Sequence, residues 1–360
     1  MKNPPLHLFQ HLRPTASEIS RDGGGERSPR GISSSPRKPA QWGHRASRRF
    51  SVLALWTAAV IVASPGPKLA AADTPPLFER KNIVAWCIVP FDSVKRGPAE
   101  RAEMVKKVGL TKVAYDWRAE HVPQFEQEIL EYKKRGLEYF AFWGAHDAAF
   151  RLFEKYQLHP QIWITAPSPA GTLPRDQQIK EASAKLLPMV ERTRKLGCQL
   201  GLYNHGGWGG EPENLVAVCA YLREHHNAKH VGIVYNQHHG HSHVDRFTQA
   251  MAAMKPYLLC LNLNGLTRDG DKRGMKIQPV GQGELDLPML KIIAASGYRG
   301  PIGIIGHTDD DVELRLRDNI EGLDWLVPQL TGRPVGPKPT PRLPLLPKPA
   351  VPAKANAQKK

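Results

Sequence analysis

The sequence predicts an α/β protein folded as a (β/α)8 barrel, also called a TIM barrel. Short apolar runs alternate eight times with charged stretches of helical character along the middle of the chain. This alternation is typical of a parallel sheet with crossover helices. Eight such units close into a barrel of about 250 residues, and the 360-residue chain is long enough to hold one.

The expected strands are the apolar runs at 82–89, 112–117, 138–143, 160–165, 199–204, 230–236, 257–264 and 301–307. The expected helices include 99–108, 123–136, 177–197, 212–226 and 311–327. Apolar residues recur in them at spacings of three and four, which places them on one face of a helix. Gly136, Gly197 and Gly297 each follow a helix and precede a strand, as helix-ending glycines do.

The sequence divides into three parts. Residues 1–72 form a basic leader in which Arg48 and Arg49 precede the apolar run 52–63, the pattern of a signal peptide. That run has 12 residues, fewer than the roughly 20 that span a bilayer, so we expect export by the Sec or twin-arginine route without a permanent membrane span. Residues 73–330 form the barrel, and the Pro/Lys-rich residues 331–360 are expected to be a solvated tail.

The net charge of +16 lies outside the predicted barrel. Residues 1–72 hold 11 Lys/Arg against 3 Asp/Glu, residues 331–360 hold 7 against none, and residues 73–330 hold 32 against 31. Binding to phosphate backbones needs clustered basic residues. A nearly neutral barrel therefore does not favour a nucleic-acid partner, and the sequence gives no oligomeric state.

The four cysteines are far apart in the sequence. Cys87, Cys198, Cys219 and Cys260 contain no Cys-x-x-Cys pair, which argues against a zinc knuckle or a thioredoxin-type motif. Each lies among apolar neighbours, so we expect buried thiols. Export would also permit a disulfide, an alternative that the sequence leaves open.

Polar residues gather where the predicted strands end. In a (β/α)8 barrel the reactive side chains come from the C-terminal strand ends, where the βα loops meet. Side chains from separate strands can therefore converge on one site. The strand-end polar residues are Asp116, Arg118, His146, Asp147, Asn204, His205, Asn236, His238, His239, His241, Asn262, Asn264, His307, Asp309 and Asp310.

Several segments resemble the xylose isomerase-like TIM-barrel family of sugar and sugar-phosphate isomerases and epimerases. They are "LGLYNHGG", "VGIVYNQHHGH", "CLNLNG" and the stretch "GQGELDLPMLKIIAASGYRGPIGIIGH", within a resemblance that covers about residues 80–330. The resemblance implies a small-molecule sugar ligand and one divalent metal ion. In the family the metal is held by a Glu, an Asp, a His and a Glu from the last four strands.

This sequence departs from that ligand set. Tyr203 replaces the first Glu, Asn236 the Asp and Asn262 the His, while Ile305 or His307 stands where the last Glu is expected. Only His239 matches, as the second member of the family's Asp-x-x-His pattern. Tyr and Asn cannot replace carboxylates as bases, and neutral amides bind Mg²⁺ weakly without anionic ligands.

Three functional hypotheses follow. The first is a sugar isomerase or epimerase that transfers protons through His205, His239 and His307, or that binds one zinc-like ion at His239 and His307. The second is a carbohydrate-binding barrel without catalysis, and the third is a lyase or hydratase acting on oxidised sugars. The predicted sugar-binding residues are Asn204, Trp208, Asn236, His241, Asn262, Asn264, Trp143 and Asp116, with Trp86 as a further stacking face.

Two charged stretches have simpler interpretations. Asp309, Asp310 and Asp311 directly precede a helix, where carboxylates cap free N–H groups. The segment 268–274 is expected to be a solvated loop, with Arg268, Lys272 and Arg273 as alternative contacts to an anionic ligand.

Overall fold

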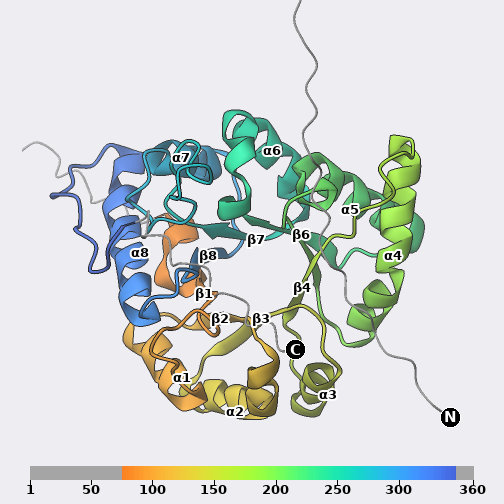
Figure 1. Ribbon diagram of the computed structural model, residues 1–360, viewed down its shortest axis with the longest axis horizontal. Coiled ribbons are helices and arrows are strands. Elements are labelled where there is room, and N and C mark those ends of the chain that lie inside the picture. The colour runs from red at the N-terminus through yellow and green to blue at the C-terminus, as the bar shows by residue number, and fades with distance from the viewer. Residues whose placement is uncertain (1–74, 346–360) are drawn as a thin grey trace, which may run out of the picture. The chain divides into compact units, whose positions relative to one another are not determined.

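The computed structural model describes residues 75–345, and they contain a closed barrel of eight parallel strands. Each strand pairs with its neighbours in sequence, and β8 pairs with β1. Figure 1 shows the strands at the centre of a ring of helices. The predicted fold class is confirmed. The strands are β1 (Ile83–Trp86), β2 (Lys112–Tyr115), β3 (Glu138–Trp143), β4 (Gln161–Thr165), β5 (Leu200–Tyr203), β6 (Val231–Asn236), β7 (Leu258–Leu263) and β8 (Ile302–Ile305).

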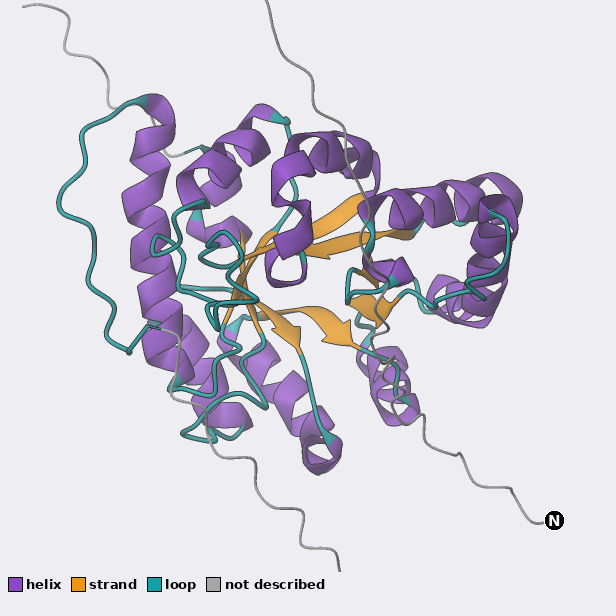
Figure 2. Ribbon diagram, turned by 45° about the horizontal axis from the view of Figure 1, so that its top comes forward, coloured by secondary structure: helices purple, strands orange, loops and turns teal. Residues whose placement is uncertain are grey.

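Helices surround the sheet on its outer side (Figure 2). Gly136, Gly197 and Gly297 adopt the left-handed conformation predicted for helix ends, with φ of 68°, 66° and 74°. Asp311 caps α8 as expected, because its carboxylate accepts from the Glu313 backbone N–H at 3.0 Å. The helices are α1 (Pro98–Lys107), α2 (Phe125–Arg135), α3 (Asp147–Tyr156), α4 (Arg175–Lys195), α5 (Pro212–His226), α6 (Phe247–Met254), α7 (Asp286–Ala295) and α8 (Val312–Leu326).

Most strands end earlier than the sequence predicted. The run 82–89 was expected to be one strand, but β1 ends at Trp86. The next residue, Cys87, has a positive φ of 58°, which is rare for a residue with a side chain and ends the extended conformation. Apolar residues beyond β1 are buried under the loop rather than in the sheet, so burial alone did not mark the strand end.

Aromatic side chains fill the barrel interior. Trp163 on β4 is fully buried at its centre, and its indole N–H donates to Gln161 Oε1 at 2.8 Å. Gly201 on β5 makes room for it, because a Cβ at that position would lie 2.8 Å from Trp163. Trp86 and Tyr203 lie beside Trp163, with ring centroids 4.9 and 6.2 Å away. The interior is therefore packed, and a ligand has to bind at its mouth.

The segment beyond residue 331, predicted as a solvated tail, contacts the barrel in its first part. Trp325 on α8 donates to the Gly336 carbonyl at 3.1 Å, and Arg342 pairs with Asp318 and Glu321. Asp318 and Glu321 on α8 thus hold Arg342 of the basic tail, a contact that composition did not reveal. The predicted leader and signal peptide lie outside the described residues.

The structure also bears on the cysteines and on membrane insertion. Cys87, Cys198, Cys219 and Cys260 are all buried and free, which confirms the expected thiols. Among residues 75–345, the helices are too short or too polar to cross a bilayer.

Candidate active site

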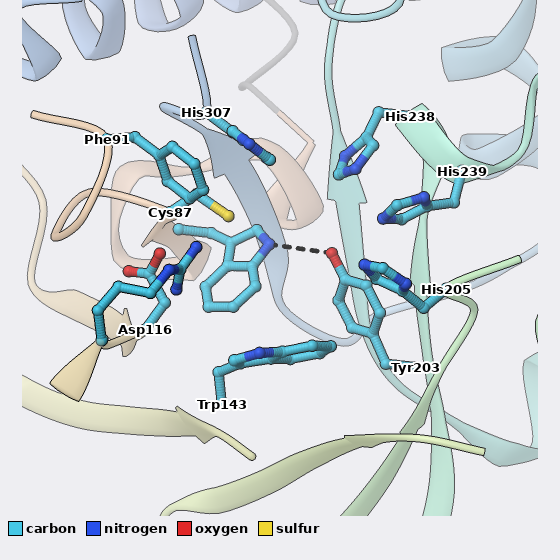
Figure 3. A pocket seen from close by; sticks show the side chains of 11 residues that line it. Cys87, Phe91, Asp116, Trp143, Tyr203, His205, His238, His239 and His307 are labelled. Carbon is cyan, nitrogen blue, oxygen red and sulfur yellow. Dashed lines mark hydrogen bonds between the residues drawn. The ribbon is translucent and has the colours of Figure 1, made fainter. Parts of the chain in front are cut away.

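A pocket opens at the C-terminal mouth of the barrel, with a cavity volume of about 80 Å³ (Figure 3). Its walls come from the ends of β1, β2, β3, β5, β6 and β8, so the barrel brings distant parts of the sequence together there. The lining side chains are Trp86, Cys87, Phe91, Asp116, Arg118, Trp143, Tyr203, His205, His238, His239 and His307.

Three aromatic side chains form the floor of the pocket. Trp86 contacts Trp143 and Tyr203, with ring centroids 5.9 and 6.1 Å apart. Tyr203 packs edge-on against Trp143 at 4.6 Å, and the Trp86 indole N–H donates to Tyr203 Oη at 3.2 Å. Flat aromatic surface with a few polar tips suits the apolar face of a sugar ring.

Four imidazoles form a histidine row, defined as His205, His239, His238 and His307, along one wall of the pocket. The ring centroids are 4.5 Å apart for His205 and His239, 3.7 Å for His239 and His238, and 5.7 Å for His238 and His307. The row joins residues from β5, β6 and β8. It provides up to four ring edges for the hydroxyl groups of one ligand.

The histidine row is uncharged at neutral pH. Burial, with help from neighbouring basic groups, lowers the pKa of His239 to about 3 and that of His307 to about 4. Burial also lowers the pKa of His238, and partial burial of the mostly exposed His205 lowers the pKa of that ring. Lys276, an exposed residue of the loop after β7, adds to the shift in all four. Neutral imidazoles both donate and accept hydrogen bonds.

Asp116 lies on the opposite side of the pocket from His205 and His239 in Figure 3. Its carboxyl group is buried, and Oδ1 accepts from the Val89 N–H at 3.3 Å. Oδ2 has no hydrogen-bond partner within residues 75–345. Burial raises the pKa of Asp116 to about 7, against the opposing effects of the Val89 N–H and Arg118. A carboxyl group with this pKa gains and loses a proton near neutral pH.

A pair of loops holds the remaining wall. Phe91, after β1, lies over His307, after β8, with ring centroids 3.6 Å apart. The two loops are joined because Ser93 N–H donates to the Asp310 carbonyl at 2.9 Å. Arg96 reinforces the junction by binding both Asp92 and Asp311. This network fixes the ring of His307 beside the pocket.

The structure brings six of the predicted site residues into the pocket and leaves six outside its lining. The six that line it are His205, His239, His307, Trp143, Asp116 and Trp86. The residues outside the lining are Asn204, Asn236, Asn262, Asn264, Trp208 and His241.

The predicted asparagines bind the protein itself. Asn204 receives the Asn236 backbone N–H at 2.7 Å and donates to the Asn236 carbonyl at 3.1 Å, which ties β5 to β6. Asn264 donates to the Gly265 carbonyl at 2.8 Å. Asn262 lies against Gly303 of β8, where a Cβ would be 1.8 Å from its Oδ1. Asn204 and Asn264 bind backbone groups because buried strand-end backbone groups need partners. A contact of these amides with a sugar stays a prediction.

Other rim residues also have structural partners. Trp208 donates to Gln178 Oε1 at 2.8 Å, and His241 lies 2.9 Å from the Lys276 carbonyl. His146 caps α3, and Asp147 pairs with Arg192. In the loop after β7, Arg268 pairs with Asp245.

Five further lining residues were not selected as site residues from the sequence. They are Cys87, Phe91, Arg118, Tyr203 and His238, of which Tyr203 was seen only as the replacement for a metal ligand. The signal that could have found Tyr203 is that successive side chains of a strand point to opposite faces of the sheet. Because Gly201 and Tyr203 face the barrel interior, the next residue, Asn204, has to face away from it.

Comparison with known proteins places the chain by its fold. No protein-family model matches the sequence, and no curated protein matches it. Among solved structures, a D-tagatose 3-epimerase-like protein is 12% identical with a TM-score of 0.52, over 70% of this chain and 100% of that chain. A xylose isomerase-like TIM barrel fused to 4-hydroxyphenylpyruvate dioxygenase is 15% identical with a TM-score of 0.50, over 70% of this chain and 43% of that chain.

The fold is that of the xylose isomerase-like TIM barrels. A barrel of this type from Mycobacterium smegmatis was solved in complex with magnesium; it is 13% identical over 69% of this chain and 96% of that chain, with a TM-score of 0.47. At such identities the likeness establishes the fold that the sequence predicted. The chemistry has to be argued from the residues of the pocket.

The metal that the resemblance to xylose isomerase-like barrels implies does not fit these residues. Tyr203 stands where the family has a metal-binding Glu, and its Oη accepts hydrogen bonds from Trp86 and Asn236. Two N–H donors therefore occupy the place where a metal ion would need an anionic ligand. The Asn262 amide nitrogen is a buried donor without a partner in the described part of the chain. Over the same residues, no three His, Cys, Asp or Glu side chains are grouped to hold an ion, His239 and His307 included. We therefore derive no step through a metal.

Proposed function

We propose that this protein is a sugar-converting enzyme that transfers a proton beside a carbonyl group, with Asp116 as the acid–base residue. The observation that carries the proposal is the Asp116 carboxyl group, which is buried, lines the pocket and has a free Oδ2. Its pKa of about 7 lies near working pH, where proton transfer in both directions is most efficient.

The pKa values favour Asp116 over the histidines as the base. With pKa values near 3 and 4, His239 and His307 are weaker bases than Asp116, whose pKa is about 7. This changes the role expected from the sequence, where the histidines were the proposed catalysts. We assign the neutral histidine row to the sugar hydroxyl groups, which it orients by donating and accepting hydrogen bonds.

The reaction starts with removal of the proton on the carbon next to the carbonyl. The Asp116 carboxylate takes that proton, the C–H electron pair forms the enediolate, and the carbonyl oxygen becomes negative. The proton of the adjacent hydroxyl group then moves to the former carbonyl oxygen, and return of the proton from Asp116 to the former carbonyl carbon completes an isomerisation. If Asp116 instead gives its proton to a β-hydroxyl group, that group leaves as water and the result is an elimination, the lyase alternative.

Solvent exchange tests the proposal. The purified protein is incubated in deuterium oxide with a panel of ketoses, 3-keto-glucosides and uronates, and label at carbon is measured by NMR. We expect exchange with at least one compound and a loss of about 10²- to 10⁴-fold in Asp116→Asn. Asp147→Asn is the matched control, since Asp147 also follows a strand but pairs with Arg192 outside the pocket. Binding without exchange would leave a carbohydrate-binding barrel, and product analysis separates isomerisation from elimination.

We also infer that the barrel is exported, from the basic and apolar pattern of residues 45–72. Cell fractionation of the full chain tests this. If the N-terminal segment directs export, removal of residues 52–63 retains the protein in the cytoplasm. Arg48→Lys combined with Arg49→Lys has the same result if export uses the twin-arginine route. Only the arginine substitutions distinguish the twin-arginine route.

A further inference from the structure

Tyr203 contributes a hydroxyl group to the aromatic floor of the pocket. It ends β5, and only 2% of its surface is exposed, although it lines the pocket. Its ring is fixed between Trp143, with centroids 4.6 Å apart, and Trp86, at 6.1 Å. The hydroxyl group therefore has a fixed position.

Two donors occupy the acceptor positions of Tyr203 Oη. Trp86 Nε1 donates at 3.2 Å, and an indole nitrogen can only donate. Asn236 Nδ2 also donates to Oη. The orientation of that amide is set by its other end, because Asn236 Oδ1 accepts from the His238 N–H at 3.3 Å. Oη therefore accepts two hydrogen bonds, and the phenol proton remains to be donated.

No acceptor for that proton is found among residues 75–345. Oη has hydrogen bonds only with Trp86 and Asn236 there. Figure 3 shows the Tyr203 hydroxyl group directed toward the middle of the pocket. A buried donor without an acceptor is costly, so an oxygen atom of a ligand at this point would be bound favourably. Burial raises the pKa of Tyr203 and keeps the phenol protonated.

We propose that Tyr203 donates its O–H hydrogen bond to the carbonyl oxygen of the bound sugar, an inference that rests on the proposed function. Asp116 and Tyr203 both line the pocket, and Figure 3 shows them on opposite sides of it, so one ligand bound between them can contact both groups. As Asp116 removes the proton, charge develops on the carbonyl oxygen and the Tyr203 hydrogen bond becomes stronger. The phenol proton stays on Tyr203, and no bond to it breaks.

The test compares wild type with Tyr203→Phe, which removes only the hydroxyl group. The probe is methyl 3-keto-glucopyranoside labelled with ¹³C at the ketone, and the infrared band of its bound carbonyl is recorded. We expect a lower wavenumber in wild type than in Tyr203→Phe, and solvent exchange slower by about 10²- to 10³-fold in the variant. Tyr235→Phe is the matched control, because Tyr235 is a buried phenol that binds His243 outside the pocket.

A measurement without ligand accompanies it. The NMR signal of the Trp86 indole N–H is expected to shift in Tyr203→Phe, because the indole loses its acceptor. Equal carbonyl bands in wild type and variant, or an unshifted indole signal, would overturn the inference. If wild type shows the band shift but no exchange, the proposed proton transfer fails while the hydrogen bond stands.

Discussion

The strand-end asparagines and the strand-end histidines occupy similar places in the sequence but have different roles in the fold. Asn204 binds the backbone of Asn236, and Asn236 binds Tyr203 and the His238 N–H. His205 and His239, one and three residues further along the chain, line the pocket. The asparagines are buried in the barrel wall, whereas His205 is exposed and His239 half-buried.

The difference has a physical cause. A carboxamide has a donor and an acceptor on one short side chain, so it can satisfy both backbone groups of a neighbouring strand end. An imidazole is larger and follows the last strand residue, where the chain has already turned to the mouth. Polar residues at a barrel rim thus separate into those that hold the strands together and those left to meet a ligand.

The largest expected effect that separates the two sets is on stability. Asn204→Ala leaves the Asn236 backbone N–H and carbonyl unpaired in a buried place, so we expect a loss of about 3 kcal/mol in the free energy of unfolding. His205→Ala, at an exposed position, should change it by less than about 0.5 kcal/mol while weakening sugar binding. Urea unfolding and calorimetry measure both, and equal stability of the two variants would contradict the comparison.

A smaller effect is expected in the pH dependence of stability. The pKa of His239 falls from 6.5 to about 3 on folding, so below pH 6.5 the unfolded chain takes up a proton that the folded protein does not. Stability therefore falls as pH drops from about 6.5 towards 4. His239→Gln should reduce this slope by about 1 kcal/mol per pH unit.

Asp116 has the opposite dependence. Its pKa rises from 3.8 to about 7 on folding, so the folded protein keeps a proton that the unfolded chain loses. This contribution to stability is lost as pH rises from about 4 to 7, and Asp116→Asn should remove that loss. Urea unfolding at half-unit pH intervals measures how the free energy of unfolding depends on pH in wild type and in both variants. A variant with the same pH dependence as wild type would contradict the direction of the pKa shift at the residue it replaces.

The smallest effect concerns two tryptophans that the sequence treated alike. Trp143 is part of the pocket floor, whereas Trp208 binds Gln178 outside it. We expect Trp143→Leu to weaken sugar binding about threefold to tenfold, through loss of aromatic contact. Trp208→Leu should leave the affinity within about twofold. Titration calorimetry with the best-bound sugar of the exchange panel measures both affinities. A larger loss of affinity in Trp208→Leu than in Trp143→Leu would show that the Trp208 loop closes over the ligand.

The sequence by itself determined the barrel. Eight alternating units, glycines at helix ends and the capping Asp311 are local features, fixed by periodicity and backbone conformation. It also placed the site at the strand ends, since every strand of a parallel barrel points its C-terminal end to the same mouth. His205, His239, His307, Trp143 and Asp116 were found in this way.

Only the tertiary structure decided which rim residues face a ligand. Asn204 and Tyr203 are neighbours in sequence, yet one joins two strands and the other offers its hydroxyl group to the pocket. That choice depends on where β5 ends and on partners 32 or more residues away, such as Asn236 and Trp86. The raised pKa of Asp116 likewise depends on burial by other strands, which no local pattern contains.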